Sequence, residues 1–365
     1  MSDKVEFLTE KKIDVMKIIS VLQQKSKLSL FDKDILEKII TKFQKNDFSL
    51  LTPQEIQFLN HNPANIWAQY LVFRYKFKEF PSNHIVSKFP IYLLIEPVSA
   101  CNLRCVMCFQ IDKTFSGTKD FMGYMDIDLF KKVVDEAYQK GTKAITLASR
   151  GEPTLHPKLG EMLEYCSGKF FELKINTNAT KLPEKLIHQI LTSGVTDVVF
   201  SIDSYTKENY ESIRVGGIFE NVLNNIKKFK EIQTKDYPNS KCATRVSGVK
   251  VDKSQNEKLF KEFWEKYVDH VVMVNMLHRW DTYHNPKEIM ANEPCHALWE
   301  RMYVWYDGKC NPCDADYKSE LNLGNISNSN IEEVWNGEKY KQIREAHLNN
   351  NRSSYFPCDR CPNGA

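Results

Sequence analysis

Three cysteines lie within eight residues, at Cys101, Cys105 and Cys108, directly after the apolar, strand-like run 91–95. Thiolates are soft ligands that suit zinc, Cu(I) and iron–sulfur clusters. Three thiolates bound to a four-iron cluster leave one iron without a protein ligand. Such an iron is open to chemistry, so this stretch predicts a reactive metal centre on a loop that follows a strand.

Two other interpretations of the three cysteines are weaker. A structural zinc site has four protein ligands, and the sequence shows no fourth ligand near this loop. A disulfide is disfavoured because an odd number of thiols on a tight loop cannot all pair and the chain shows no sign of secretion.

The spacing Cys-x3-Cys-x-apolar-Cys, with Met107 in the apolar position, resembles the signature of radical S-adenosylmethionine (SAM) enzymes. The resemblance implies that Cys101, Cys105 and Cys108 hold a [4Fe–4S] cluster, with Met107 among the residues at the cofactors. It also implies that SAM chelates the open iron through its amino and carboxylate groups. One-electron reduction then cleaves SAM and releases a 5′-deoxyadenosyl radical.

Composition sets limits on partners and location. The chain has 365 residues, enough for two or three domains, and a net charge of +3 without a dominant basic block, which gives no reason to expect nucleic acid. The sequence shows neither a signal peptide nor an apolar run of about twenty residues. We therefore expect a cytoplasmic protein without a membrane partner, whose ten cysteines are mainly metal ligands.

Residues 1–88 are predicted to form a helical N-terminal extension. Thr52-Pro53-Gln54-Glu55 is a capping box with proline at the first helical position, and Asn62-Pro63 repeats the pairing of an N-cap with proline. The extension packs against the main domain or binds a peptide or partner. Peptide-modifying relatives of the family often carry a winged-helix domain here, and no three-strand pattern matches it.

Residues 89–290 alternate strand-like runs with amphipathic helices, which predicts a parallel sheet. The pattern alone permits an open doubly wound sheet or a partial barrel. The family resemblance favours an α/β partial (β/α)6 TIM barrel. The predicted strands are 91–95, 144–147, 171–175, 197–202, 244–249 and 271–276.

Ligands collect at the carboxyl ends of parallel strands, and a recognisable motif follows the second predicted strand. Gly151-Glu152-Pro153 resembles the family motif that holds the amino group of SAM. Glu152 can accept a hydrogen bond from an ammonium group, and Gly151 permits close approach of the backbone. A turn with a capping glutamate is the alternative.

Other polar residues lie at or near the later strand ends. The resemblance suggests Ser201, with Asp203 and Asn178, for the ribose of SAM, although turn formation explains Asn and Asp equally well. Arg245, in the fifth strand, can pair with the SAM carboxylate or be a surface residue. Residues 278–280, which follow the sixth strand, are candidates for substrate contact.

A second cysteine group occupies residues 291–365, where the alternation of strands and helices stops. Cys310-x2-Cys313 and Cys358-x2-Cys361 have the spacing of a zinc ribbon, and a second iron–sulfur cluster is the competing interpretation. Asp307-Gly308 predicts a hairpin turn between two strands. The cysteine spacing alone does not distinguish zinc from an iron–sulfur cluster.

The order Pro-Cys, Asp-Gly turn, Pro-Cys-Asp, Leu-Gly-Asn, Val-Trp-Asn and Cys-x2-Cys resembles the SPASM/twitch extension of radical SAM enzymes. Matched to that family, Cys295, Cys313, Cys358 and Cys361 bind one auxiliary [4Fe–4S] cluster, which makes two clusters per chain. Cys310 is then left over, although an exchange with Cys313 stays open. Four cysteine ligands leave no open iron, so the auxiliary cluster is expected to transfer electrons.

These features predict a radical SAM oxidoreductase whose auxiliary cluster accepts an electron from a substrate radical. The single-cluster architecture resembles that of the 2-deoxy-scyllo-inosamine dehydrogenase family, which suggests oxidation of a secondary alcohol on a sugar or cyclitol. Maturation of a ribosomally made peptide by crosslinking or epimerisation is the alternative. A non-catalytic metal-binding or electron-transfer protein is a third possibility. The family further implies flavodoxin or ferredoxin as the reductant.

Overall fold

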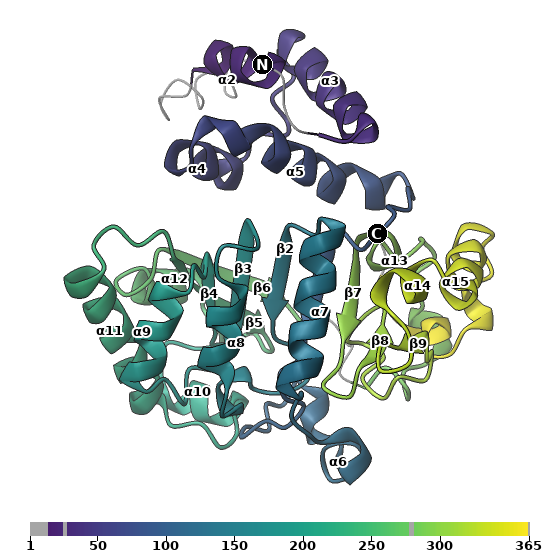
Figure 1. Ribbon diagram of the computed structural model, residues 1–365. Helices are drawn as coiled ribbons and strands as arrows, with labels where there is room; N and C mark the ends of the chain where they lie inside the picture. The colour runs from purple at the N-terminus through teal and green to yellow at the C-terminus, as the bar shows by residue number, and fades with distance from the viewer. Residues whose placement is uncertain (1–13, 25–27, 277–280, 364–365) are drawn as a thin grey trace. The chain divides into compact units, whose positions relative to one another are not determined.

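The computed structural model describes residues 14–24, 28–276 and 281–363 (Figure 1). The chain divides into two compact units, 1–86 and 87–365. The second unit contains both the expected barrel and the expected cysteine-rich region. The finer division at residues 88 and 290 therefore stays a prediction.

The first unit is helical, as its capping signals indicate. The backbone N–H of Thr52 donates to the Glu55 carboxylate at 2.9 Å, completing the predicted capping box of α4. No strand forms among the described residues 14–24 and 28–86, so these residues contain no winged-helix hairpin. The helices are α2 (Val15–Gln23), α3 (Leu30–Gln44), α4 (Pro53–His61) and α5 (Trp67–Ser82).

The second unit is built on a nine-stranded sheet in the order β6-β5-β4-β3-β2-β1-β7-β8-β9. The strands from β6 to β7 pair in parallel, which confirms the expected α/β class and the partial barrel. All six strands predicted for the barrel form within two residues of their expected ends. They are β1 (Tyr92–Ile95), β2 (Ala144–Leu147), β3 (Glu172–Thr177), β4 (Asp197–Ser201), β5 (Ala243–Lys250) and β6 (His270–Asn275).

Helices connect the parallel strands, and Figure 1 shows α7, α8 and α9 in front of the strands. Asp126 caps α7 by accepting from the backbone N–H of Asp128 at 2.8 Å, and Gly141 ends it with φ of 90°. The helices are α6 (Lys113–Ser116), α7 (Ile127–Lys140), α8 (Leu159–Cys166), α9 (Glu184–Thr192), α10 (Lys207–Ile213), α11 (Phe219–Asp236) and α12 (Glu257–Trp264).

The two faces of the sheet differ in chemistry, because successive side chains of a strand point to opposite faces. Leu93, Ile145 and Ile175 belong to the hydrophobic core that the strands share with the helices. The opposite face lines the interior of the partial barrel and is more polar. Its residues include Tyr92, Thr146, Lys174, Asn176, Ser201, Arg245 and Ser247.

The last part of the chain extends the same sheet. The predicted hairpin forms from β7 (Arg301–Val304) and β8 (Lys309–Asn311), and β9 (Gly324–Asn325) follows. Pairing of β7 with β1 was not expected, because the sequence signals show only the hairpin's own turn. The helices here are α13 (Ala297–Glu300), α14 (Ile331–Trp335) and α15 (Glu338–Leu348).

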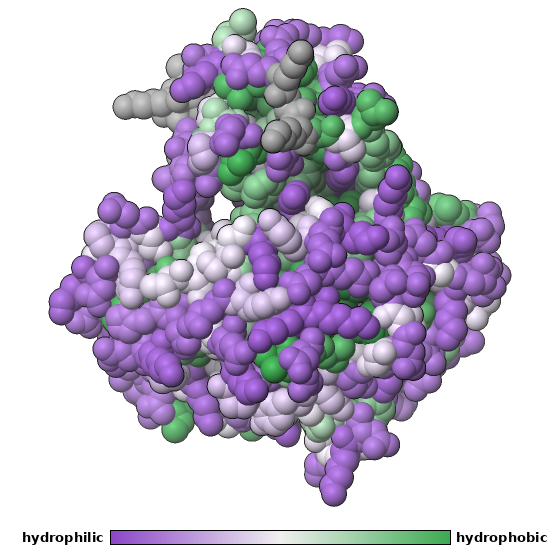
Figure 2. Space-filling view, in the orientation of Figure 1, coloured by the Kyte–Doolittle hydropathy of each residue, from purple (hydrophilic) through white to green (hydrophobic). Residues whose placement is uncertain are grey.

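The described surface carries no sign of a membrane span. Of the helices among residues 14–24, 28–276 and 281–363, none is long and apolar enough to cross a bilayer. The face of the molecule in Figure 2 is mostly hydrophilic.

Candidate functional site

The first cysteine group lies on the loop after β1, where the backbone is fixed by a neighbouring segment. The N–H of Arg104 donates to the carbonyl of Val215 at 2.8 Å, and that of Val106 donates to the carbonyl of Ile213 at 3.0 Å. These bonds hold the loop that carries all three thiols at the carboxyl end of the sheet. Met107 is half-buried within the same loop.

The thiol of Cys101 accepts hydrogen bonds from both sides. The backbone N–H of Leu103 lies 3.5 Å from its sulfur, and the side-chain amide of Asn178 lies 3.9 Å from it. Burial raises the pKa of Cys101 to about 11, and that of Cys108 to about 12, in the metal-free chain. Binding a cluster therefore requires the release of thiol protons.

The loop after β2 approaches the cysteine loop closely. A Cβ atom at Gly151 would lie 2.2 Å from the carbonyl oxygen of Val98 and 2.5 Å from that of Ala100, so only glycine fits. The N–H of Glu152 donates to the carbonyl of Ala100 at 2.9 Å. The sequence prediction that these two motifs lie together is consistent with this geometry.

The carboxylate of Glu152 is buried and bonded within the protein. One oxygen accepts from the hydroxyls of Thr177 (2.6 Å) and Thr154 (2.7 Å), and the other accepts from the N–H of Asn178 at 2.7 Å. Glu152 thus ties the end of β3 to the loop after β2. Its predicted contact with the SAM amino group stays a prediction.

Asp203 is also fully buried, and both of its oxygens have protein partners. One accepts from the N–H of Val249 at 2.7 Å and the other from Nε of Arg214 at 2.5 Å. The Arg214 charge in turn opposes the effect of burial, which raises the pKa of Cys105. Arg214 carried no sequence signal, and the predicted ribose contact of Asp203 stays a prediction.

Polar residues of the inner face form a row across β3, β4 and β5. Asn176 pairs in register with Val199, which pairs with Arg245. The Oδ1 of Asn176 and the Nε of Arg245 are buried, with no hydrogen-bond partner among the described residues. Ser201 and Ser247 lie one step closer to the carboxyl end of the sheet. Such unpaired groups can receive a ligand.

The second cysteine group comes together from three segments. Burial, and then the neighbouring thiols of Cys361, Cys295 and Cys358, raise the pKa of Cys313. Cys310 instead lies fully buried in the hydrophobic core. This arrangement supports the proposed ligand set of four, with Cys310 outside it.

Arg352 connects the segments of this second group. Its guanidinium is buried and donates to the backbone carbonyls of Glu293 (3.0 Å), Cys358 (3.1 Å) and Cys361 (3.0 Å). This role could not be predicted from the sequence, because a single arginine outside a motif looks like a surface residue. Residues 278–280, which were substrate-contact candidates, lie outside the described residues.

The donor sets fit iron–sulfur clusters. All ten cysteines are free thiols, and seven of them make up the two proposed ligand sets. Thiolate ligands select such clusters, and N–H groups aimed at the sulfur atoms, as at Cys101, tune them. Among the residues that the structure describes, no three His, Cys, Asp or Glu side chains are arranged to hold a single metal ion.

Comparison with known families identifies both regions. Residues 95–263 match the model of the radical SAM superfamily, and residues 295–362 match that of SPASM, an iron–sulfur cluster-binding domain. The tungsten-containing aldehyde ferredoxin oxidoreductase cofactor-modifying protein of Pyrococcus furiosus is 34% identical over 38% of this chain. The antilisterial bacteriocin subtilosin biosynthesis protein AlbA of Bacillus subtilis is 22% identical over 75% of it. The matches span 39% and 65% of those two proteins.

Solved structures establish the same fold. Streptococcus suis SuiB bound to precursor peptide SuiA has a TM-score of 0.59 at 17% identity, over 93% of this chain and 89% of that chain. BtrN in complex with AdoMet and 2-DOIA has a TM-score of 0.50 at 18% identity, over 76% and 94%. S-adenosylmethionine and iron–sulfur clusters are the cofactors that these domains use. The chain therefore contains a radical SAM domain and a C-terminal SPASM iron–sulfur cluster-binding domain.

Proposed function

We propose that this enzyme is an oxidoreductase that oxidises a substrate carbon inside the partial barrel and passes one electron to an auxiliary cluster. The observation that carries this proposal is the position of Cys313, which packs against the inner-face residues Leu94, Tyr303 and Trp305. The auxiliary ligands thus adjoin the space in which a substrate radical would form. Oxidation of an alcohol to a ketone requires the loss of a hydrogen atom, an electron and a proton.

The chain's own residues supply binding and orientation. We assign Cys101, Cys105 and Cys108 to the SAM cluster, and Cys295, Cys313, Cys358 and Cys361 to the auxiliary cluster. When bound, the first cluster and SAM supply the 5′-deoxyadenosyl radical. The loops at Gly151 and Asn178 position SAM, with Ser201 and Arg245 as its further contacts. A flavodoxin or ferredoxin is the proposed electron donor.

A polyhydroxylated small molecule is the proposed substrate. Asn176, Ser247 and Ser149 supply donors and acceptors on or near the inner face, and the Ser149 hydroxyl is buried without a partner among the described residues. Hydroxyl groups of a sugar or cyclitol suit such a surface, because buried polar groups require partners. BtrN, which shares this fold, was solved with 2-DOIA.

Peptide maturation is the second candidate. AlbA, the mycofactocin maturase MftC of Mycobacterium tuberculosis and SuiB with its precursor peptide share family or fold with this chain. Against it, the described residues of the first unit contain no strand. The two candidates differ in which compounds accelerate SAM cleavage.

The test begins with anaerobic reconstitution, iron and sulfide analysis and SAM cleavage upon reduction. About eight irons per chain, falling to about four in the Cys101/Cys105/Cys108 triple alanine variant with loss of cleavage, is the expected result. About four irons with bound zinc in the wild type would overturn the electron-acceptor role. Stimulation of 5′-deoxyadenosine formation by cyclitols or amino sugars supports oxidation of a small molecule. Stimulation only by precursor peptides would favour maturation.

A further inference from the structure

A buried ion pair joins the ends of β1 and β2. Glu96 is fully buried and Arg150 is 3% exposed. Nε and Nη2 of Arg150 donate to the two carboxylate oxygens of Glu96 at 2.7 and 2.6 Å, and the backbone N–H of Arg150 adds a third bond at 3.1 Å. This two-pronged geometry is the strongest form of the pair, because each carboxylate oxygen faces its own N–H group.

The pair lies at the base of both SAM-binding loops. Glu96 is five residues before Cys101, and Arg150 directly precedes Gly151. Gln110, after the last cysteine of the loop, donates to the carbonyls of Ser99 (2.8 Å) and Arg150 (2.6 Å). The Glu96–Arg150 pair and Gln110 therefore tie the cysteine loop to the Gly151-Glu152 loop.

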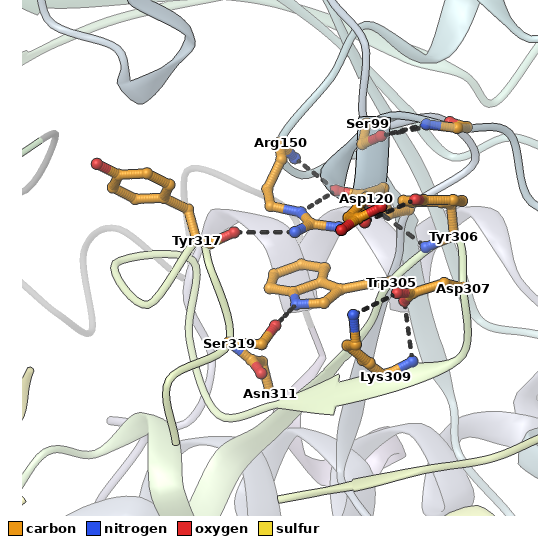
Figure 3. Close-up of polar contacts among 12 residues, drawn as sticks. Ser99, Asp120, Arg150, Trp305, Tyr306, Asp307, Lys309, Asn311, Tyr317 and Ser319 are labelled. Carbon is orange, nitrogen blue, oxygen red and sulfur yellow. Dashed lines mark hydrogen bonds and ion pairs between the residues drawn. The ribbon is translucent and has the colours of Figure 1, made fainter. Parts of the chain in front are cut away.

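Further contacts of this pair come from residues 305–317, which we call the auxiliary segment (Figure 3). Nη1 of Arg150 donates to the carbonyl of Tyr317 at 2.9 Å, and the guanidinium lies 4.3 Å from the ring centroid of Trp305. The N–H of Tyr306 donates to Glu96 at 3.2 Å. The SAM-binding loops and the auxiliary segment thus share one buried charge pair.

Cys313 is linked to the same contacts. It packs against Trp305, and it is four residues before Tyr317. Between them, Asp316 accepts hydrogen bonds from Tyr283 (2.8 Å) and from Asn311 (3.2 Å), which fixes the turn on both sides of the cysteine. Trp305 and Tyr317 thus connect Cys313 to Arg150.

We propose that Arg150 is a positioning residue that couples the auxiliary cluster site to SAM binding. Loading of the auxiliary cluster orders the segment from Cys313 to Tyr317, which holds Arg150 and therefore the two SAM-binding loops. The auxiliary site then strengthens SAM binding in addition to its role as electron acceptor. This inference rests on the auxiliary ligand set of the proposed function.

The test is a double-mutant cycle on the dissociation constant of SAM, measured by anaerobic equilibrium dialysis of reconstituted full-length protein. Cys361→Ala removes an auxiliary ligand, and Arg150→Lys keeps the charge at Glu96 but lacks the fork that also reaches Tyr317. We expect Cys361→Ala to weaken SAM binding about tenfold in the wild-type background. In the Arg150→Lys background it should change the constant less than twofold.

Controls separate coupling from general damage. Cys310→Ala removes a buried thiol outside the ligand set, and Arg344→Lys alters another buried arginine that donates to backbone carbonyls of Leu298 and Trp335. Both control variants should leave the dissociation constant of SAM unchanged. If Arg150→Lys fails to fold, the double variant Glu96→Gln/Arg150→Met removes the pair without leaving a buried unpaired charge.

Two results would overturn the coupling. One is an unchanged SAM constant in Cys361→Ala when iron analysis shows that half of the iron has gone. The other is an equal weakening in the presence and absence of the Arg150 change, because independent effects add. An unchanged iron content in Cys361→Ala would instead contradict the ligand set, and with it the proposed function.

Discussion

The side-chain amide of Asn178 points at the thiol of Cys101, with 3.9 Å between nitrogen and sulfur. The same amide donates to the side chain of Asn102 at 3.0 Å, so it is fixed beside the cysteine loop. Hydrogen bonds to cluster sulfur atoms tune reduction potentials. If Cys101 is a cluster ligand as proposed, the segment that follows β3 is expected to influence the reduction potential of that cluster.

Replacing Asn178 tests this relationship. Asn178→Ala removes a donor to a thiolate ligand, and we expect a more negative reduction potential of the SAM cluster, because the reduced, more negative state loses a hydrogen bond. An anaerobic redox titration followed by electron paramagnetic resonance measures the shift. Thr180→Ala is the control, since Thr180 donates to Asn178 without contacting sulfur. An equal potential in Asn178→Ala and wild type would contradict a role for the amide.

Arg352→Ala should empty the auxiliary site selectively. The arginine donates to the carbonyls of Glu293, Cys358 and Cys361, and each hydrogen bond to a charged group contributes about 1.5–3 kcal/mol. We expect iron to fall by about half while SAM cleavage without substrate persists. Arg360→Ala, at a half-exposed site in the same segment, should keep its iron. Full iron content in Arg352→Ala would show that the carbonyl contacts are dispensable.

The sequence predicted the barrel strands because buried parallel strands are continuous apolar runs with turn signals between them. It predicted the two cysteine groups because their spacing is specific. It missed the addition of β7 to β1, since pairing between distant strands leaves no local pattern. The sequence analysis also missed the burial and the structural roles of Arg352, Arg214 and the Glu96–Arg150 pair. The local sequence around a single charged residue does not reveal whether that residue is exposed or buried.

The assignments of Glu152 and Asp203 show a different limit. Sequence places both carboxylates correctly at strand ends, where ligands collect. It does not show that threonine hydroxyls donate hydrogen bonds to the Glu152 carboxylate, or that Arg214 pairs with the Asp203 carboxylate. A motif therefore predicts which loop forms the site more reliably than which atom touches the ligand.

Asp112 links the segment after the cysteine loop to the auxiliary segment. Although burial alone would raise its pKa, hydrogen bonds from Lys318, Thr114 and Tyr317 hold the pKa of Asp112 well below its usual range. A carboxyl whose pKa is lower in the folded state stabilises the fold above its unfolded pKa of about 3.9, and this stabilisation is lost as pH falls through the folded value.

Asp112→Asn should accordingly lower the free energy of unfolding by about 1 kcal/mol, a value reduced for partial exposure. Because pH 6 and pH 8 both lie above the folded and the unfolded pKa of Asp112, the variant and the wild type should differ in free energy of unfolding by the same amount at each pH. Thermal unfolding of the reconstituted protein at both pH values measures it. Asp128→Asn, whose carboxyl pairs with no cation among the described contacts, is the control. A difference that grows between pH 8 and pH 6 would contradict the assignment.

Arg245→Met tests the proposed contact with the SAM carboxylate. The Nε of Arg245 is buried and has no hydrogen-bond partner among the described residues, so a ligand is expected to supply the acceptor. Loss of one charge-assisted bond, about 1.5–3 kcal/mol, should weaken SAM binding at least tenfold. Lys174→Met, on the same face but one step farther from the carboxyl end, should change it less than twofold. Unchanged SAM binding in Arg245→Met would contradict the proposed contact with the SAM carboxylate.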